Sequence, residues 1–205
     1  MNRFLITQSL LSSWNYMFTC YEDGQAEAYA DFIRTLNREP SEPTEAMWNG
    51  IEFENEVYKV VMGVHRQHHL KWEQGIQTVA EIIKDATVQV RVQRDIAVCG
   101  INFLLYGVLD ALSAGVIYDV KYLNKSFNSA DLAGKYYNSP QHPAYLFMVP
   151  EAQRFEYLVS DGTDLYKEVY DRSITRPISE IITEFVQSLE AMNLIDIYKE
   201  KWLAK

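Results

Sequence analysis

A change in hydrophobic periodicity near position 87 constrains the fold of this chain more than any other sequence feature. In residues 87–93, valines alternate with polar residues, and residues 101–109 are almost continuously apolar. The segment 116–123 follows after the turn formed by Ser113, Ala114 and Gly115. Alternation is typical of a half-buried strand, and a continuous apolar run is typical of a central one. The pattern therefore predicts a group of strands that ends in a β-hairpin.

Helices are expected on both sides of this strand group, because apolar residues there recur every three or four positions. The expected helices are 9–19, 25–36, 44–69, 129–137, one after Pro140, one from Pro177 to about 191, and a short one after that. Two more strands, 154–160 and 165–170, flank an Asp-Gly turn. This order predicts an α/β fold with a central mixed β-sheet flanked by helices. The 205 residues contain no internal repeat or linker, so 1–205 is expected to be a single domain.

The charge and the cysteines limit the classes of protein to consider. A net charge of -9 argues against a nonspecific nucleic-acid coat. Residues 121–150 nevertheless hold three lysines against one acidic residue, so a basic groove on an acidic body is compatible with the sequence. Cys20 and Cys99 have neither metal-site nor disulfide spacing, which favours a reduced, cytoplasmic setting. The first eleven residues are too polar for a signal peptide, and no apolar run approaches the roughly 20 residues that span a bilayer.

The predicted hairpin carries the residues most suited to chemistry. Asp119 and Lys121 alternate with apolar residues, so they share one face of a strand, about 7 Å apart. Asp110 follows the preceding apolar run, where the hairpin can bring it near Asp119. Two carboxylates and an amine suit a divalent cation that activates water and binds phosphate. The alternative is that these residues are simply the solvent-facing side of an amphipathic strand.

Four segments resemble the motifs of a known family. Gly107-Val108-Leu109-Asp110 followed by Asp119-Val120-Lys121 resembles the bipartite GxxD and DxK core of the PD-(D/E)xK nuclease superfamily. Gln141-His142-Pro143-Ala144-Tyr145 resembles the QxxxY motif of its RecB-like branch, which includes phage-type exonucleases. Gly50-Ile51-Glu52-Phe53-Glu54 resembles the first motif of the family. The polar start at residues 7–14 is similar to the opening helix of many RecB-like nucleases, so the resemblance spans about residues 7–160.

The resemblance implies a restriction-endonuclease-like core and a metal-dependent deoxyribonuclease. In such an enzyme Mg²⁺ or Mn²⁺ would be held by Glu54, Asp110, Asp119 and the carbonyl group of Val120, and Lys121 would help to activate the attacking water. Periodicity alone does not choose between the two glutamates at positions 54 and 56, since they border opposite sides of one apolar helix face. The resemblance assigns the ligand role to Glu54.

The same resemblance gives expectations about supporting residues and partners. Gln141 and Tyr145 would support the site from one face of a helix. The implied activity is that of an exonuclease of phage or DNA recombination and repair type, acting on linear double-stranded or single-stranded DNA ends. A homo-oligomer is compatible with it, and no membrane partner is expected. Iron–sulfur members of this branch use four cysteine ligands, and this chain has two, so no iron–sulfur cluster is expected.

Other classes of function are compatible with parts of the sequence. One is a catalytically inactive DNA-binding or regulatory protein that has kept the nuclease fold. Another is a metal hydrolase that acts on a small phosphoester. His65 and His69, four residues apart, could bind zinc on a helix, but no third ligand is apparent nearby.

Overall fold

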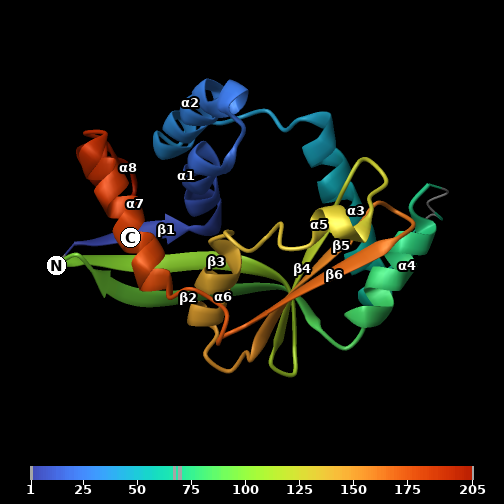
Figure 1. Cartoon of the computed structure of the whole chain (residues 1–205). Helices are drawn as coiled ribbons and strands as arrows, with labels where there is room; N and C mark the ends of the chain where they lie inside the picture. Colours follow the sequence, from blue (N-terminus) through green and yellow to red (C-terminus); the bar gives the residue numbers. More distant parts are fainter. Residues whose placement is uncertain (1, 67, 69–70, 205) are drawn as a thin grey trace.

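The computed structural model describes residues 2–66, 68 and 71–204, and Figure 1 shows the whole chain. The strands are β1 (Arg3–Thr7), β2 (Thr87–Val98), β3 (Ile101–Ser113), β4 (Val116–Tyr122), β5 (Arg154–Ser160) and β6 (Leu165–Asp171). The helices are α1 (Gln8–Thr19), a 3-10 turn (Glu22–Gly24), α2 (Gln25–Leu36), α3 (Glu45–Val61), α4 (Glu73–Ile82), α5 (Ser129–Leu132), α6 (Gln141–Met148), α7 (Ile178–Ala191) and α8 (Ile195–Lys201). The chain thus has the mixed α/β fold that its periodicity predicts.

The strands form one mixed sheet in the order β1-β3-β4-β5-β6, with β2 paired to the other edge of β3. β1 runs parallel to β3, and β4 runs parallel to β5. The remaining pairs are antiparallel, including the β3–β4 hairpin. Ala114 and Gly115 form its turn with φ of 38° and 84°, a left-handed conformation that glycine adopts without strain.

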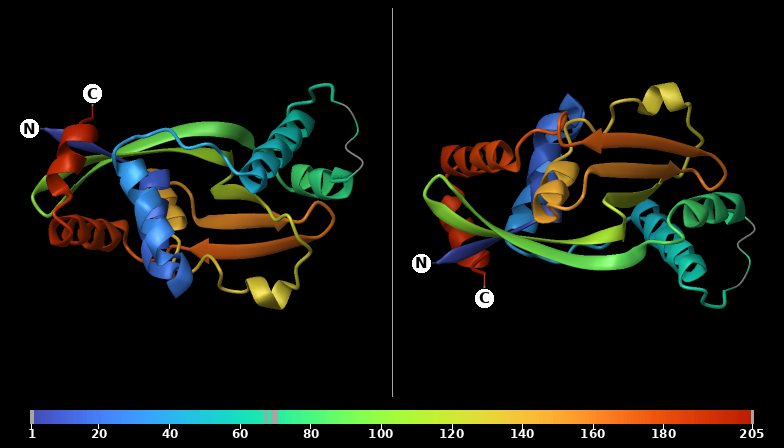
Figure 2. Two further views of the ribbon diagram at one scale, coloured as in Figure 1. Left: turned by 90° about the horizontal axis from the view of Figure 1, so that it is seen from above. Right: turned by 90° about the horizontal axis from the view of Figure 1, so that it is seen from below.

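Helices cover both faces of the sheet, and each face has its own hydrophobic core. On one face, α3 and α4 bury Phe53, Val57 and Ile76 against Val120 of β4. On the other face, α1, α2, α6, α7 and α8 pack on the rest of the sheet around a larger core. Figure 2 shows α3 and α4 at one end of the molecule and α7 and α8 at the other. β4 therefore lies between two helical layers, and its side chains alternate between them.

Local sequence signals explain where the main helices begin. The hydroxyl groups of Thr7 and Thr44 accept hydrogen bonds from backbone N–H groups three residues later, which caps α1 and α3. Pro140 immediately precedes α6, as expected for a proline at a helix start. The hairpin at 113–116 and the Asp-Gly turn between β5 and β6 also agree with the prediction.

Several boundaries differ from those predicted. β1 and α4 were not predicted, and α3 ends at Val61, before a turn, whereas the periodicity predicts a helix through position 69. Position 69 itself lies outside the described residues. The helix predicted over 129–137 is only the single turn of α5, followed by hydrogen-bonded turns. β3 continues to Ser113, so Asp110 lies within a strand.

Among the described residues, no helix combines the length and apolar character needed to cross a membrane. Both cysteines are free thiols.

Candidate active site

A gap along one edge of β3 determines where the candidate site lies. On this edge, β1 pairs with β3 from Asn102 to Tyr106, and β4 pairs with it only from Ala111 to Ser113. Residues 107–110, which form the GxxD motif, fall between the two partners. The gap is where β3 and β4 diverge, so side chains from the two helical layers can meet there.

The opposite edge of β3 is also irregular at Asp110. β2 pairs Val88 with Ala111 and Val90 with Leu109, so Gln89 has no partner in the ladder. Gln89 has a φ of 55°, a left-handed conformation that few non-glycine residues adopt. Gln89 stands opposite Asp110 and the register is the same on both sides, so the ladder is interrupted at this pair without an inserted residue. A local distortion of β2 therefore lies opposite a predicted site residue, Asp110.

The carboxylate of Asp110 joins the diverging strands. Ala111 pairs with Tyr118, so Asp110 and Asp119 are the next residues on each strand. The Oδ2 atom of Asp110 accepts a hydrogen bond of 2.8 Å from the backbone N–H of Val120. A side chain thus satisfies a strand N–H group at the point where the backbone pairing of β3 with β4 has ended.

Asp119 is the buried centre of the group. Only 3% of it is exposed, and its Oδ1 accepts hydrogen bonds from Lys121 at 3.0 Å and from the side-chain amide of Gln141. The structure therefore confirms that Asp119 and Lys121 share one face of β4. It also brings the first residue of α6 to the same carboxylate.

Glu54 approaches this group from α3. It is partly buried, and burial raises its pKa to about 7; the positive charge of Lys121 opposes this shift, and the negative charge of Asp119 adds to it. Glu56 faces other partners, since Lys59 donates to it at 2.5 Å and Arg66 lies 3.6 Å away. Geometry thus places Glu54, of the two glutamates, within electrostatic reach of Asp119 and Lys121.

Crowding of carboxylates perturbs the other ionisable groups. Burial, and then the charge of Asp119, raises the pKa of Asp110 well above its ordinary value. Burial also raises the pKa of Asp119, although Lys121 opposes the shift. Burial alone would lower the pKa of Lys121, but the charges of Asp119 and Asp110 outweigh it and raise the pKa. Lys121 therefore carries a positive charge at neutral pH.

Tyr145 braces β3 and accounts for the glycine of the GxxD motif. Its hydroxyl donates a hydrogen bond of 2.9 Å to the carbonyl of Val108. A Cβ atom at Gly107 would lie 3.0 Å from the Tyr145 hydroxyl oxygen and closer still to the ring atom Cε1. The ring thus occupies the space that any larger residue at position 107 would need. Of the two QxxxY residues, Gln141 contacts a carboxylate of the site and Tyr145 contacts the backbone of β3.

Whether these residues suit a metal ion can be tested on the oxygens of Asp119. No group of three His, Cys, Asp or Glu side chains lies close enough together to coordinate one metal ion within residues 2–66, 68 and 71–204. The Oδ2 atom of Asp119 lies 2.8 Å from the ammonium group of Lys121, yet it is buried and accepts no hydrogen bond from a described residue. The ion pair with Lys121 compensates this oxygen only in part, because a carboxylate oxygen has two lone pairs, and such oxygens are the ligands that Mg²⁺ and Mn²⁺ prefer. On this observation Asp119 can offer an oxygen to a hard divalent cation, and Glu54 and Asp110 would have to move closer to it to complete a ligand set.

Sequence reasoning missed two tyrosines that lie beside the site. Burial, and then the charges of Asp110 and Glu54, raises the pKa of Tyr58 on α3. Tyr58 follows Glu54 by four residues, and this spacing could have placed it on the same helix face. Tyr136 lies in the loop before α6, close enough for the charges of Lys121 and Asp119 to act on its phenol. No sequence signal marked Tyr136.

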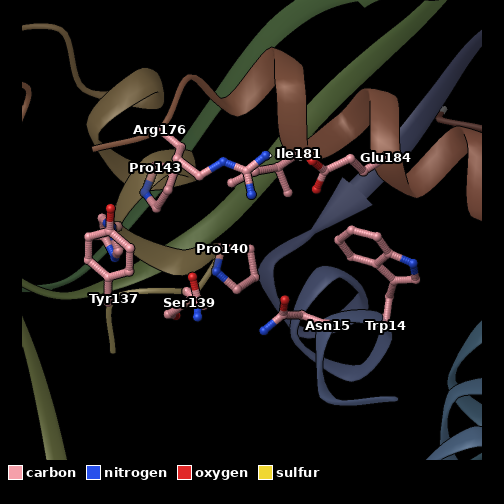
Figure 3. A pocket seen from close by; sticks show the side chains of 11 residues that line it. Trp14, Asn15, Tyr137, Ser139, Pro140, Pro143, Arg176, Ile181 and Glu184 are labelled. Atoms are coloured by element: carbon pink, nitrogen blue, oxygen red, sulfur yellow. Dashed lines mark hydrogen bonds and ion pairs between the residues drawn. The ribbon is translucent and has the colours of Figure 1, made fainter. Parts of the chain in front are cut away.

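The other candidate sites do not coincide with these residues. His65 is described, but His69 lies outside the described residues, so the zinc pair is not tested. Figure 3 shows a small pocket. It is lined by residues of α1, of α7 and of the loop that precedes α6. Its lining includes Trp14, Tyr137 and Arg176, and none of the predicted site residues.

Comparison with known proteins supports the fold. No protein-family model matches the chain, and no curated protein matches its sequence. Among solved structures, it is similar to the exonuclease LHK-Exo in complex with dAMP, with a TM-score of 0.51 and 16% identity over 96% of this chain and 92% of that one. It is also similar to SSO0001, with a TM-score of 0.52 and 13% identity over 94% of this chain and 77% of that one. At such identities the likeness establishes a shared fold, which is therefore one found in a nuclease.

Proposed function

We propose that this chain is a metal-dependent deoxyribonuclease of the PD-(D/E)xK superfamily, acting as an exonuclease of the RecB-like, phage or DNA recombination and repair type. The observation that carries the proposal is that Glu54, Asp110, Asp119 and Lys121 lie within electrostatic reach of one another where β3 and β4 diverge. The likeness to an exonuclease crystallised with a nucleotide supports DNA as the substrate. A cytoplasmic location and a homo-oligomeric state are compatible with this proposal.

Each residue of the site would have a distinct role. Glu54, Asp110, Asp119 and the carbonyl of Val120 would hold Mg²⁺ or Mn²⁺, which when bound polarises the phosphate and lowers the pKa of a water molecule. Lys121, being protonated, offers positive charge and hydrogen-bond donors to the phosphate and can orient a water molecule, but it cannot take up a proton.

Two residues of α6 would support these groups. Gln141 fixes the orientation of Asp119 through its side-chain amide. Tyr145 holds β3 in place three residues before Asp110, through its contacts with Gly107 and Val108. Neither residue needs to touch the substrate in order to affect the rate, because a small displacement of the carboxylates would suffice.

The decisive experiment compares end-labelled linear DNA with covalently closed circular DNA in the presence of Mg²⁺, Mn²⁺ or EDTA. We expect degradation of the linear DNA only, and only with a metal ion. The variant Lys121→Ala should lose at least about a hundredfold in rate, as expected when a group that stabilises transition-state charge is removed. Lys199→Ala is the matched control, since Lys199 is an exposed lysine of α8, outside the segment 121–150.

Other outcomes would redirect the proposal. A folded wild-type protein that cleaves no DNA with either metal would favour the inactive DNA-binding or regulatory alternative. Cleavage of closed circles would refute the exonuclease assignment. A chromogenic phosphodiester that is hydrolysed without competition from linear DNA would indicate a small phosphoester as the substrate.

A further inference from the structure

The loop of residues 133–140 places an aromatic side chain beside the candidate site. The ring of Tyr136 stacks on that of Tyr157, with centroids 4.2 Å apart and planes 15° from parallel. Tyr157 is the partner of Asp119 in the parallel β4–β5 ladder. Paired residues on adjacent strands project to the same face of a sheet. Tyr136 therefore lies over the face that carries Asp119.

The hydroxyl of Tyr136 is available to a ligand. The residue is only partly buried, and in the part of the chain that the structure describes no hydrogen bond to its hydroxyl is formed. Burial raises the pKa of Tyr136 to about 12; the charge of Lys121 opposes this shift, and that of Asp119 adds to it. The phenol thus stays protonated at neutral pH and can donate a hydrogen bond.

The backbone of Tyr136 is held by a buried carboxylate. Glu168 of β6, 8% exposed, accepts hydrogen bonds of 3.2 Å from the N–H groups of both Gly134 and Tyr136. The hydroxyls of Tyr166 and Tyr170 donate to the same carboxylate, which fixes its orientation. Glu168 thus accepts hydrogen bonds from four donors, two of them backbone N–H groups of the loop. These contacts hold the backbone of Tyr136 in place beside the site.

We propose that Tyr136 is a further substrate-contacting residue, whose hydroxyl donates a hydrogen bond to a phosphate oxygen of the bound DNA strand, and that Glu168 positions it. This inference rests on the proposed nuclease function, because the phosphate is the substrate group expected beside Asp119 and Lys121. A phenol hydroxyl is suited to this task, since it donates to an anionic oxygen without adding charge of its own.

The test is the rate of degradation of end-labelled linear DNA with Mn²⁺ by Tyr136→Phe, which removes the hydroxyl and keeps the stacked ring. We expect kcat/KM to fall by about ten- to a hundredfold, the range for a hydrogen bond to a charged group. Tyr137→Phe is the matched control: Tyr137 is exposed, adjacent in sequence, and lines the separate pocket of Figure 3, so its rate should equal that of wild type.

The positioning role of Glu168 is tested by a double-mutant cycle. Glu168→Gln should lower kcat/KM in the wild-type background, and it should lower it much less in the Tyr136→Phe background, because the group it positions is already gone. A purely structural role would give equal losses in both backgrounds and would overturn the assignment of Glu168.

The outcomes distinguish a failure of the Tyr136 proposal from a failure of the proposed nuclease function. If wild type is active, Lys121→Ala is not, and Tyr136→Phe stays within twofold of wild type, the role of Tyr136 is refuted and the nuclease function stands. An equal loss in Tyr137→Phe would also refute it, since the effect would not be specific to the hydroxyl beside the site. If wild type cleaves no DNA, both proposals fall together.

Discussion

Replacing Gly107 by alanine tests whether the close approach of α6 to β3 shapes the candidate site. Gly107 is buried, and an added Cβ atom would lie 3.1 Å from Cζ of Tyr145 and nearer still to Cε1. Distances this short require the ring or the strand to shift. The backbone of Gly107 is not left-handed, so alanine itself is compatible with its conformation. Any destabilisation therefore arises from the contact with the tyrosine.

The expected magnitude follows from three terms. Overpacking a filled core typically costs about 1–3 kcal/mol. Displacement of the ring also weakens the hydrogen bond from Tyr145 to Val108, which contributes about 1 kcal/mol. Alanine stabilises by restricting the unfolded chain, but by less than about 1 kcal/mol. We therefore expect Gly107→Ala to lower the free energy of unfolding by about 1–4 kcal/mol, measured by urea denaturation at pH 7.5.

Two further variants identify the cause. In a Tyr145→Leu background the ring is absent, so Gly107→Ala should be less destabilising there by at least about 1 kcal/mol. Gly50→Ala is the matched control: Gly50 lies in α3 with no atom within 4 Å of its added Cβ, so alanine should be neutral or stabilising. Equal effects of Gly107→Ala in both backgrounds would refute the steric argument.

The remaining predictions concern charge and metal binding. Burial lowers the pKa of His142 from 6.5 to about 4, so between these pH values the unfolded chain binds a proton that the folded chain excludes. The free energy of unfolding should therefore fall by up to about 3 kcal/mol between pH 7 and pH 4. His142→Phe should remove this part of the loss. Arg172 donates to the carbonyl of Leu146 in α6 and to those of Val149 and Ala152 after it. Arg172→Ala should therefore lower the free energy of unfolding in urea by about 2–4 kcal/mol, and a change below about 0.5 kcal/mol would contradict this. Asp119→Asn should raise the melting temperature without metal, by relieving a buried charge, and should abolish any stabilisation by Mn²⁺; a metal-induced shift equal to that of wild type would exclude Asp119 as a ligand.

The regular part of the fold was predictable because its periodicity is local. The alternation that starts at Thr87 and the turn at Gly115 are set by neighbouring residues, and they predict β2, β3 and the hairpin. β1 was missed because Arg3–Thr7 is only five residues long, and it is a strand because it pairs with β3 about a hundred positions away. α4 was missed in a polar stretch, since its apolar face is completed only by packing against α3.

In the candidate site, too, local sequence patterns predicted some features, and others depend on tertiary contacts. The placement of Asp119 and Lys121 on one face follows from strand geometry alone. The motif resemblance placed Gln141 at the site, but its contact with Asp119 was not predicted. Tyr136 could not be found in this way, because its position depends on Glu168 in a distant strand. Periodicity did not choose between the glutamates at positions 54 and 56; the motif resemblance assigned the role to Glu54, and the structure places Glu54 near Asp119 and Lys121.

The gap in β3 pairing has a consequence for the behaviour of the protein in concentrated solution. Strand edges with unpaired backbone groups invite pairing with other chains, and this leads to self-association. Here the hydroxyl of Tyr145 donates a hydrogen bond to the carbonyl of Val108, and the carboxylate of Asp110 accepts one from the N–H of Val120. The side chains that build the candidate site thus also shield the open edge from intermolecular β-pairing. Variants at Tyr145 or Asp110 should be watched for aggregation as well as for lost activity.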